Sequence, residues 1–188
     1  VMSRRNRINR SENIISGHIK RIAVGTLASG LTSLNITDAT TAVTGALGQV
    51  YRFYRYKRLK FTILPMTGTN NNVAAQFIPS GNSTASPANN LVEGAHVCMM
   101  TNTCSVPQSF TVEYSTLKSN MIWFLTDGDA TEPSADIVGQ IFIEGNGSEA
   151  FQYILELDYE FKTPVDVASI AAAVNRKEQP PVRNTSIL

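Results

Sequence analysis

The sequence predicts an all-β protein, an eight-stranded jelly-roll sandwich with short inserted helices. Its composition is 43% hydrophobic and only 16% charged, which is typical of a folded domain rather than a disordered chain. The 188 residues suffice for one well-filled core but are too few for two ordinary domains. Segments with a strand pattern follow one another along the chain, bounded by Pro, Gly and Asn.

Eight segments have this strand pattern. They cover residues 18–27, 57–63, 71–80, 96–101, 109–116, 121–128, 136–147 and 151–164. The last is the clearest, because apolar side chains from Tyr153 to Phe161 alternate with polar ones from Gln152 to Lys162. Eight strands that form two sheets match the strand number of a jelly roll.

The remaining segments are expected to be loops, short helices and termini. Residues 30–44 are rich in Thr, Ser and Asn and predict a loop, and residues 88–93 predict a short helix. A helix that runs into the strand at Lys57 is predicted from apolar residues at helical spacing. They are Ala46, Leu47, Val50, Tyr51 and Tyr54. We therefore expect an arm at 1–17, one domain at 18–164, and a helix with an extended tail at 165–188.

Charge is divided unevenly along the chain. Residues 1–60 hold 11 of the 16 Lys and Arg and only two acids, a net charge of +9, whereas the rest holds five basic and 13 acidic groups, a net charge of −8. A basic segment of this kind is typical of proteins that bind polyanions. The predicted RNA-binding residues are Arg4, Arg5, Arg7, Arg10, Lys20 and Arg21. A solvated basic tail is the alternative interpretation.

The stretch "QVYRFYRYKRLKF" (49–61) alternates cations with aromatic residues. The change from helical to strand spacing indicates that its aromatics pack in the core, since a base-stacking platform needs several exposed aromatics together. The cations are expected to face outward and to bind either RNA or the acids of a neighbouring subunit. They are Arg52, Arg55, Lys57, Arg58 and Lys60.

Other classes of protein find little support in the sequence. His18 and His96 are the only histidines, and no nucleophile or phosphate-loop motif is present, so we do not expect an enzyme. Cys98 and Cys104 have no zinc-ligand spacing and are expected to be reduced thiols. No apolar run reaches the ~18 residues of a membrane span, and no signal peptide is visible; we therefore expect no membrane partner and synthesis in the cytoplasm.

Two segments resemble the shell domain in capsid proteins of small icosahedral positive-strand RNA viruses, of the tombusvirus and sobemovirus kind. "ALGQVYRFYRYKRLKFTILP" is similar to a Tyr-rich helix that runs into the second strand, on the residues Tyr51, Tyr54, Arg55, Leu59, Phe61 and Pro65. "DIVGQIFIEGNGSEAFQYILELDYEFKTP" is similar to the closing pair of strands, on Val138 to Ile143, Gly145 to Gly147 and Leu155 to Pro164. Together the two segments cover about 50 residues.

The resemblance implies a virion protein that packs with copies of itself into a closed shell around single-stranded RNA, which a basic arm contacts. The family often has an acidic D-x-x-D pair after the fourth strand that binds calcium between subunits. This pair is not evident here, because "FIPSGNSTASPANN" contains no acid. No cofactor is therefore expected, and calcium at subunit interfaces stays open. The candidate oxygen ligands are Asp127, Asp129, Glu132 and Asp136, for which loop acids in water are the favoured interpretation.

Two further functions remain open from the sequence. One is a jelly-roll binding module of the lectin or cytokine type, which shares the strand number but does not need the basic arm. The other is a nonstructural RNA-binding protein, which shares the arm but does not need to self-associate.

Overall fold

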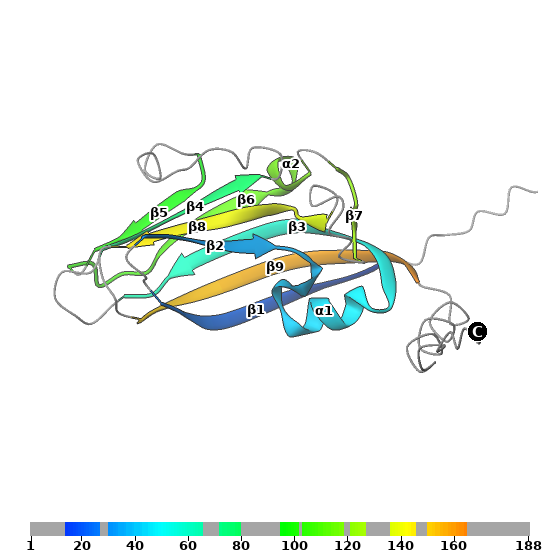
Figure 1. Cartoon of the computed structure of the whole chain (residues 1–188), viewed down its shortest axis with the longest axis horizontal. Helices are drawn as coiled ribbons and strands as arrows, with labels where there is room; N and C mark the ends of the chain where they lie inside the picture. The colour runs from blue at the N-terminus through cyan, green and yellow to red at the C-terminus, as the bar shows by residue number, and fades with distance from the viewer. Residues whose placement is uncertain are drawn as a thin grey trace, which may run out of the picture.

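The molecule is a sandwich of two antiparallel sheets whose strands run along its length (Figure 1). The computed structural model describes residues 14–26, 30–65, 72–79, 95–101, 103–118, 121–126, 136–145 and 150–164. One sheet, called sheet A here, has the strand order β1 (Ile15–Thr26), β9 (Ala150–Pro164), β3 (Tyr51–Ile63) and β6 (Gln108–Glu113). The other, sheet B, has the order β2 (Gly30–Ile36), β8 (Gly139–Gly145), β4 (Val73–Pro79) and β5 (Val97–Met100). A ninth strand, β7 (Phe124–Leu125), pairs with β3 outside this order.

This arrangement is the predicted jelly-roll sandwich, confirmed as an all-β fold of two sheets. Consecutive strands mostly alternate between the sheets, so that neighbours within a sheet lie far apart in sequence. The first and last described strands, β1 and β9, pair side by side over their full lengths, from Ile15 opposite Phe161 to Thr26 opposite Ala150. Among the described residues, no helix is long and apolar enough to cross a membrane.

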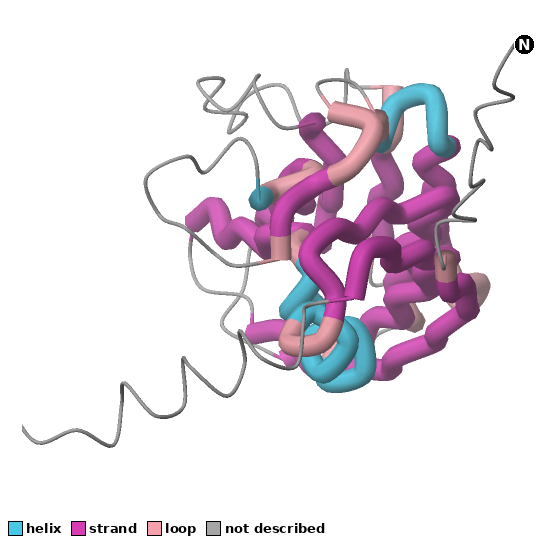
Figure 2. Tube along the Cα trace, turned by 90° about the vertical axis from the view of Figure 1, so that its right-hand side faces the viewer, coloured by secondary structure: helices cyan, strands magenta, loops and turns pink. Residues whose placement is uncertain are grey.

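Three short helical segments are described between the strands. They are the 3₁₀-helix η1 (Asp38–Thr40), α1 (Ala42–Gly48) and α2 (Tyr114–Leu117). Thr41 caps the start of α1: its hydroxyl accepts a hydrogen bond from the Thr44 amide at 3.2 Å, because the first amides of a helix have no partner within it. The end-on view in Figure 2 places helical segments on opposite sides of the strand layers.

The core lies between the two sheets and is built largely from β3 and β9. The side chains of Tyr54, Leu59, Phe61 and Phe161 are fully buried. Tyr54 stacks on Phe161 with ring centroids 6.0 Å apart, and its hydroxyl donates a hydrogen bond to the carbonyl of Asp136 at 2.5 Å. Core packing of these aromatics was predicted and is confirmed, and each of the two buried tyrosine hydroxyls has a partner, as burial requires.

The expected helix over Ala46 to Tyr54 is wrong in its second half. Helix α1 ends at Gly48, and from Tyr51 the chain is already in β3. A β-bulge between Tyr56 and Arg58 shifts the register with β9. Before the bulge the even-numbered Tyr54 and Tyr56 face the core, and after it the odd-numbered residues do. The alternation from Leu59 onward therefore does not continue in phase to Tyr54, and the strand was predicted to begin too late.

Four other expectations are corrected by the fold. Residues 30–44 contain β2, η1 and the start of α1 rather than a loop, and within the described residues 121–126 only the two residues of β7 belong to sheet A. The predicted strand at 109–116 ends at Glu113, after which the chain turns into α2. The strand at 18–27 begins earlier, at Ile15, so residues 15–17 belong to the sheet and not to the arm. The helices expected at 88–93 and after Pro164 lie outside the described residues.

Candidate nucleic-acid and assembly surface

The outer face of sheet A carries a row of acids between two rows of cations. Strand β9 lies between β1 and β3, and its outward side chains Glu156, Asp158 and Glu160 alternate with buried ones. On the β1 side, His18 Nδ1 lies 2.6 Å from Asp158 Oδ1, and Lys20 Nζ lies 3.4 Å from Glu156 Oε1. Antiparallel pairing sets these contacts directly, because His18 and Lys20 are the register partners of Asp158 and Glu156.

The same acids also face β3. Arg58 is the register partner of Asp158, and Lys60 is that of Glu156. These two cations and the two acids surround a small surface hollow together with His18. In this central part of the face, cations of β1 and β3 are therefore placed around carboxylates of the same subunit.

Arg55 occupies the next position along β3 and is held more tightly. Its Nε donates a hydrogen bond to Glu160 Oε2 at 2.6 Å, and its Nη1 donates to the Tyr114 hydroxyl at 2.9 Å. The side chains of Arg55 and Glu160 are only 18% and 20% exposed, so water screens this pair less than the pair of Lys20 and Glu156, where Lys20 is 55% exposed.

Beyond Arg55 the cations rest on aromatic rings. The Arg55 guanidinium carbon lies 4.1 Å from the centre of the Trp123 ring and 5.4 Å from that of Tyr114. Three lysines make contacts of the same kind, each with its nitrogen near a ring centre: Lys57 at 4.3 Å and Lys118 at 5.5 Å from Tyr114, and Lys162 at 4.5 Å from Trp123 and 5.6 Å from Phe53. We call Arg55, Lys57, Lys118, Lys162, Tyr114 and Trp123 the cation–aromatic cluster.

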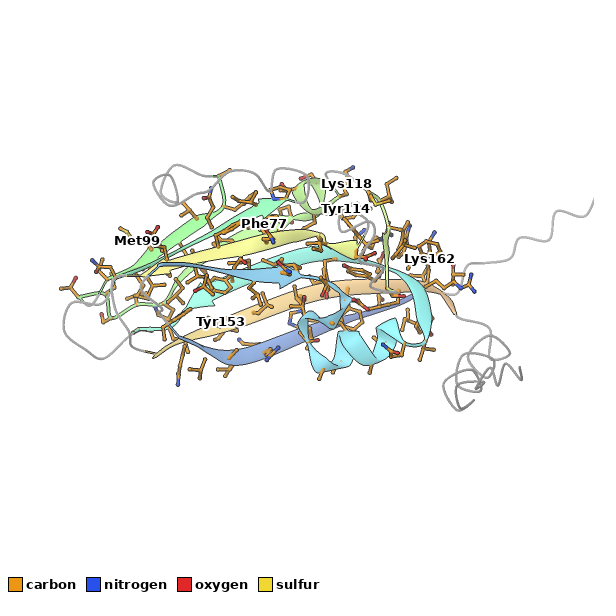
Figure 3. All side chains as sticks on the ribbon, in the orientation of Figure 1. Phe77, Met99, Tyr114, Lys118, Tyr153 and Lys162 are labelled. Carbon is orange, nitrogen blue, oxygen red and sulfur yellow. The ribbon has the colours of Figure 1, made fainter. Side chains whose placement is uncertain are left out.

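The cluster lies at one end of the sandwich. Figure 3 shows Tyr114, Lys118 and Lys162 at the end that carries α2 and β7, whereas Met99 and Tyr153 lie toward the opposite end. The sequence predicted the cations of β3 as an outward surface but missed Tyr114 and Trp123, which were assigned to strands. No local signal reveals their role, because α2 and β7 are brought to β3 only by the fold.

The structure places the other predicted residues as follows. Arg4, Arg5, Arg7 and Arg10, and the candidate calcium ligands Asp127, Asp129 and Glu132, lie outside the described residues. The Nη1 atom of Arg21 donates to the Thr40 carbonyl at 2.9 Å, which connects β1 to η1, and Arg52 is exposed near the start of β3.

The fourth candidate calcium ligand, Asp136, is buried beside Tyr54, and its backbone carbonyl accepts the hydrogen bond from the Tyr54 hydroxyl. Within the described ranges, no three His, Cys, Asp or Glu side chains cluster as a metal site would require.

Burial perturbs several ionisable groups away from this surface. Desolvation raises the pKa of both Tyr54 and Tyr56 well above the usual value. Burial also raises the pKa of the Cys98 thiol to about 12, whereas the hydrogen bond from the Thr101 hydroxyl lowers the pKa of Cys104. Both cysteines are free thiols, as the sequence predicted.

Comparison with solved structures identifies the fold. The structure of Cocksfoot mottle virus superposes with a TM-score of 0.66 at 12% identity, covering 90% of this chain and 93% of that chain. The fold is that of a small-virus coat protein. The structure of Tobacco necrosis virus matches with a TM-score of 0.63 at 14% identity, covering 82% of this chain and 100% of that chain. The structure of Melon necrotic spot virus matches with a TM-score of 0.63 at 18% identity, covering 81% of this chain and 50% of that chain. No protein-family model and no curated protein matches the sequence.

The coat-protein fold agrees with the resemblance that the sequence carries. The structural matches are capsid proteins of tombusviruses, sobemoviruses, tymoviruses and nodaviruses, which include the two groups named from the residue patterns. The segment similar to the family's closing strands forms β8 and β9, the last two strands among the described residues. The segment similar to a helix and second strand forms α1 and β3 instead, with the strand beginning at Tyr51.

Proposed function

We propose that this protein is a viral capsid protein, located in the virion, that assembles with copies of itself into a closed shell and packages single-stranded RNA through its basic N-terminal arm. The observation that carries the proposal is the order of the two sheets, β1-β9-β3-β6 and β2-β8-β4-β5, in a domain that covers 93% of a virus coat-protein chain. The proposed role is structural rather than enzymatic, and synthesis takes place in the host cytoplasm.

Unpartnered apolar surface on β1 supports the assembly part of the proposal. β1 is an edge strand of sheet A, so one side of its backbone has no neighbouring strand within the part of the chain that the structure describes. Ile22 and Val24 on it are 66% and 63% exposed. A long edge strand with exposed apolar side chains is a surface that proteins normally cover by association.

The charge distribution supports the RNA part. Glu156 and Glu160 are paired with Lys20 and Arg55 within the same domain, and Asp158 lies beside His18. The four arginines between Arg4 and Arg10 precede β1 and have no comparable acidic strand in the sequence beside them, which holds only Glu12. Each phosphate that such an arm neutralises releases counterions and strengthens binding.

Sedimentation of the purified protein, with absorbance at 260 and 280 nm before and after nuclease, tests both parts. We expect megadalton particles that contain nuclease-protected RNA. A full-length variant with Arg4, Arg5, Arg7 and Arg10 changed to Gln should still form particles but should protect much less RNA. A monomer or small oligomer without RNA, at every salt concentration and pH tested, would overturn the capsid proposal in favour of a binding module. Unchanged RNA content in the arm variant would overturn the role of the arm.

A further inference from the structure

We propose that the cation–aromatic cluster is a second site for single-stranded nucleic acid, on the folded domain and independent of the arm, which holds the phosphodiester backbone. The inference deepens the proposed function, because it names a further contact for the packaged RNA. It rests on how the cations of the cluster are held, where they come from in the fold, and which anions of the chain are already paired.

Two cations of the cluster, Lys57 and Lys118, contact an aromatic ring but no described carboxylate. Lys57 and Lys118 both rest against the Tyr114 ring, 4.3 and 5.5 Å from its centre. An aromatic ring fixes the position of a cation through its quadrupole but carries no net charge of its own. Among the described residues, neither Lys57 nor Lys118 forms an ion pair. The charge of both lysines is therefore available to an external anion, and its position is already fixed, which lowers the entropic cost of binding.

The fold brings the residues of the cluster together from separate segments. Lys57 comes from β3, Lys118 follows α2, and Trp123 precedes β7. The bulge between Tyr56 and Arg58 makes Lys57 the additional residue of β3. Bulges of this kind redirect a side chain and are common beside functional sites.

The exposure of the cluster fits an extended ligand at the surface. Lys118 is exposed, Lys57 and both rings are half-buried, and Arg55 is 18% exposed beneath them. Ile122, next to Trp123, is 62% exposed. Nucleic acid offers both elements that this surface can bind, phosphates for the lysines and flat apolar bases for the side chain of Ile122 and the ring edges.

An acidic surface of a second subunit is the competing partner, and the structure favours it less. The three acids of β9 are already paired with His18, Lys20 and Arg55. A neighbouring copy would have to give up these contacts in order to offer the same carboxylates to Lys57 and Lys118. RNA phosphates can approach Lys57 and Lys118 without breaking an ion pair of the domain.

The decisive test compares a variant of the cluster with a matched control in the central part of sheet A. The full-length protein with the four arm arginines changed to Gln serves as background, so that the arm does not mask the site. Into it we place Lys57→Gln with Lys118→Gln, and as control Lys20→Gln with Lys60→Gln, which removes the same charge from the central row. Binding of an oligouridylate of about twelve nucleotides is followed across salt concentrations by the fluorescence of Trp123, the chain's single tryptophan.

We expect the cluster variant to bind about tenfold more weakly and to lower the salt slope by about 1.4, because each phosphate contact on a single strand contributes about 0.7. The control pair should leave the slope close to that of the background. Polyphosphate should compete with the oligonucleotide if the lysines hold phosphates. Failure of polyphosphate to compete would overturn the phosphate contact.

Three other results would overturn the proposal. If the cluster variant binds the oligonucleotide with the same affinity as the background, the cluster is not a binding site. The same conclusion follows if the control pair loses as much affinity as the cluster variant. A cluster variant that binds RNA normally but sediments as smaller assemblies would show that the surface contacts a neighbouring subunit instead. These failures are distinct from failure of the proposed function, which is measured by particle formation and by RNA protection in the arm variant.

Discussion

Two parts of one sheet face hold cations in different ways. In the centre of sheet A, Lys20, Arg58 and Lys60 are arranged with His18 around Glu156 and Asp158, so that lysine and arginine side chains face carboxylates on a neighbouring strand. At the α2 end, Lys57 and Lys118 contact the ring of Tyr114 instead. The cations of residues 52–60 are therefore of two kinds: some face carboxylates of the same domain, and Lys57 contacts an aromatic ring.

The core beneath both parts gives the largest expected effect. Phe61 is fully buried and stacks on Tyr153 and Phe110, with centroid distances of 5.1 and 5.6 Å. Phe61→Ala should lower the free energy of unfolding by about 4 kcal/mol, because a buried cavity replaces the ring. Urea denaturation of unassembled subunits measures it. Phe53→Ala on the outer side should cost clearly less, and an equal loss in both variants would contradict the inward and outward assignment of β3.

Alkaline pH should destabilise the inner face through its tyrosines. The pKa values of Tyr54 and Tyr56 are raised in the folded state, so the folded protein holds these protons above the unfolded pKa of about 10. Their contribution to stability is complete below pH 10 and is lost as pH rises further, by up to about 1.4 kcal/mol per pH unit for each hydroxyl. Urea denaturation between pH 9 and about pH 11 measures the slope. Tyr56→Phe should make it shallower, and an unchanged slope would argue against the raised pKa of this residue.

The two carboxylates Glu160 and Glu156 should differ in their contribution to stability. Glu160→Gln leaves the partly buried Arg55 without its charged partner and should cost about 2 kcal/mol. Glu156→Gln should cost at most about 0.5 kcal/mol, because Lys20 opposite it is largely exposed. Chemical denaturation of both variants at the same salt concentration provides the comparison. Equal costs would show that burial does not distinguish the two pairs.

The smallest effect concerns salt. Lys20→Gln should lower the free energy of unfolding by about 0.5 kcal/mol in dilute buffer, and this loss should disappear at about 1 M NaCl, where exposed charges are screened. Lys57→Gln removes a cation that has no ion pair among the described residues, so its effect should not follow the same trend. Thermal denaturation at several salt concentrations would separate the two lysines, and parallel salt trends would contradict the comparison.

Sequence patterns predicted the two-sheet fold better than they predicted individual strands. The alternation from Tyr153 to Phe161 was correct because β9 is regular over this range, with one face toward the core. The stretch around Tyr54 was misassigned because the bulge at Lys57 puts it out of phase with the alternation that begins at Leu59. Of the nine strands that the structure describes, β2 was missed, and β7 is much shorter than the strand predicted there.

Composition and local pattern are enough to show which side chains are apolar enough to form a core, where glycines and prolines end the strands, and that positive charge is concentrated before residue 61. Which carboxylates face that charge depends on the tertiary structure. Pairing of β9 between β1 and β3 places carboxylates beside cations that lie more than 90 residues away, and no local pattern contains such a contact. The same holds for Tyr114 and Trp123, which become neighbours of Arg55 only because the sandwich brings α2 and β7 to the end of β3. Strand pairing is a long-range interaction, so the partner of each charge depends on the register of the sheet.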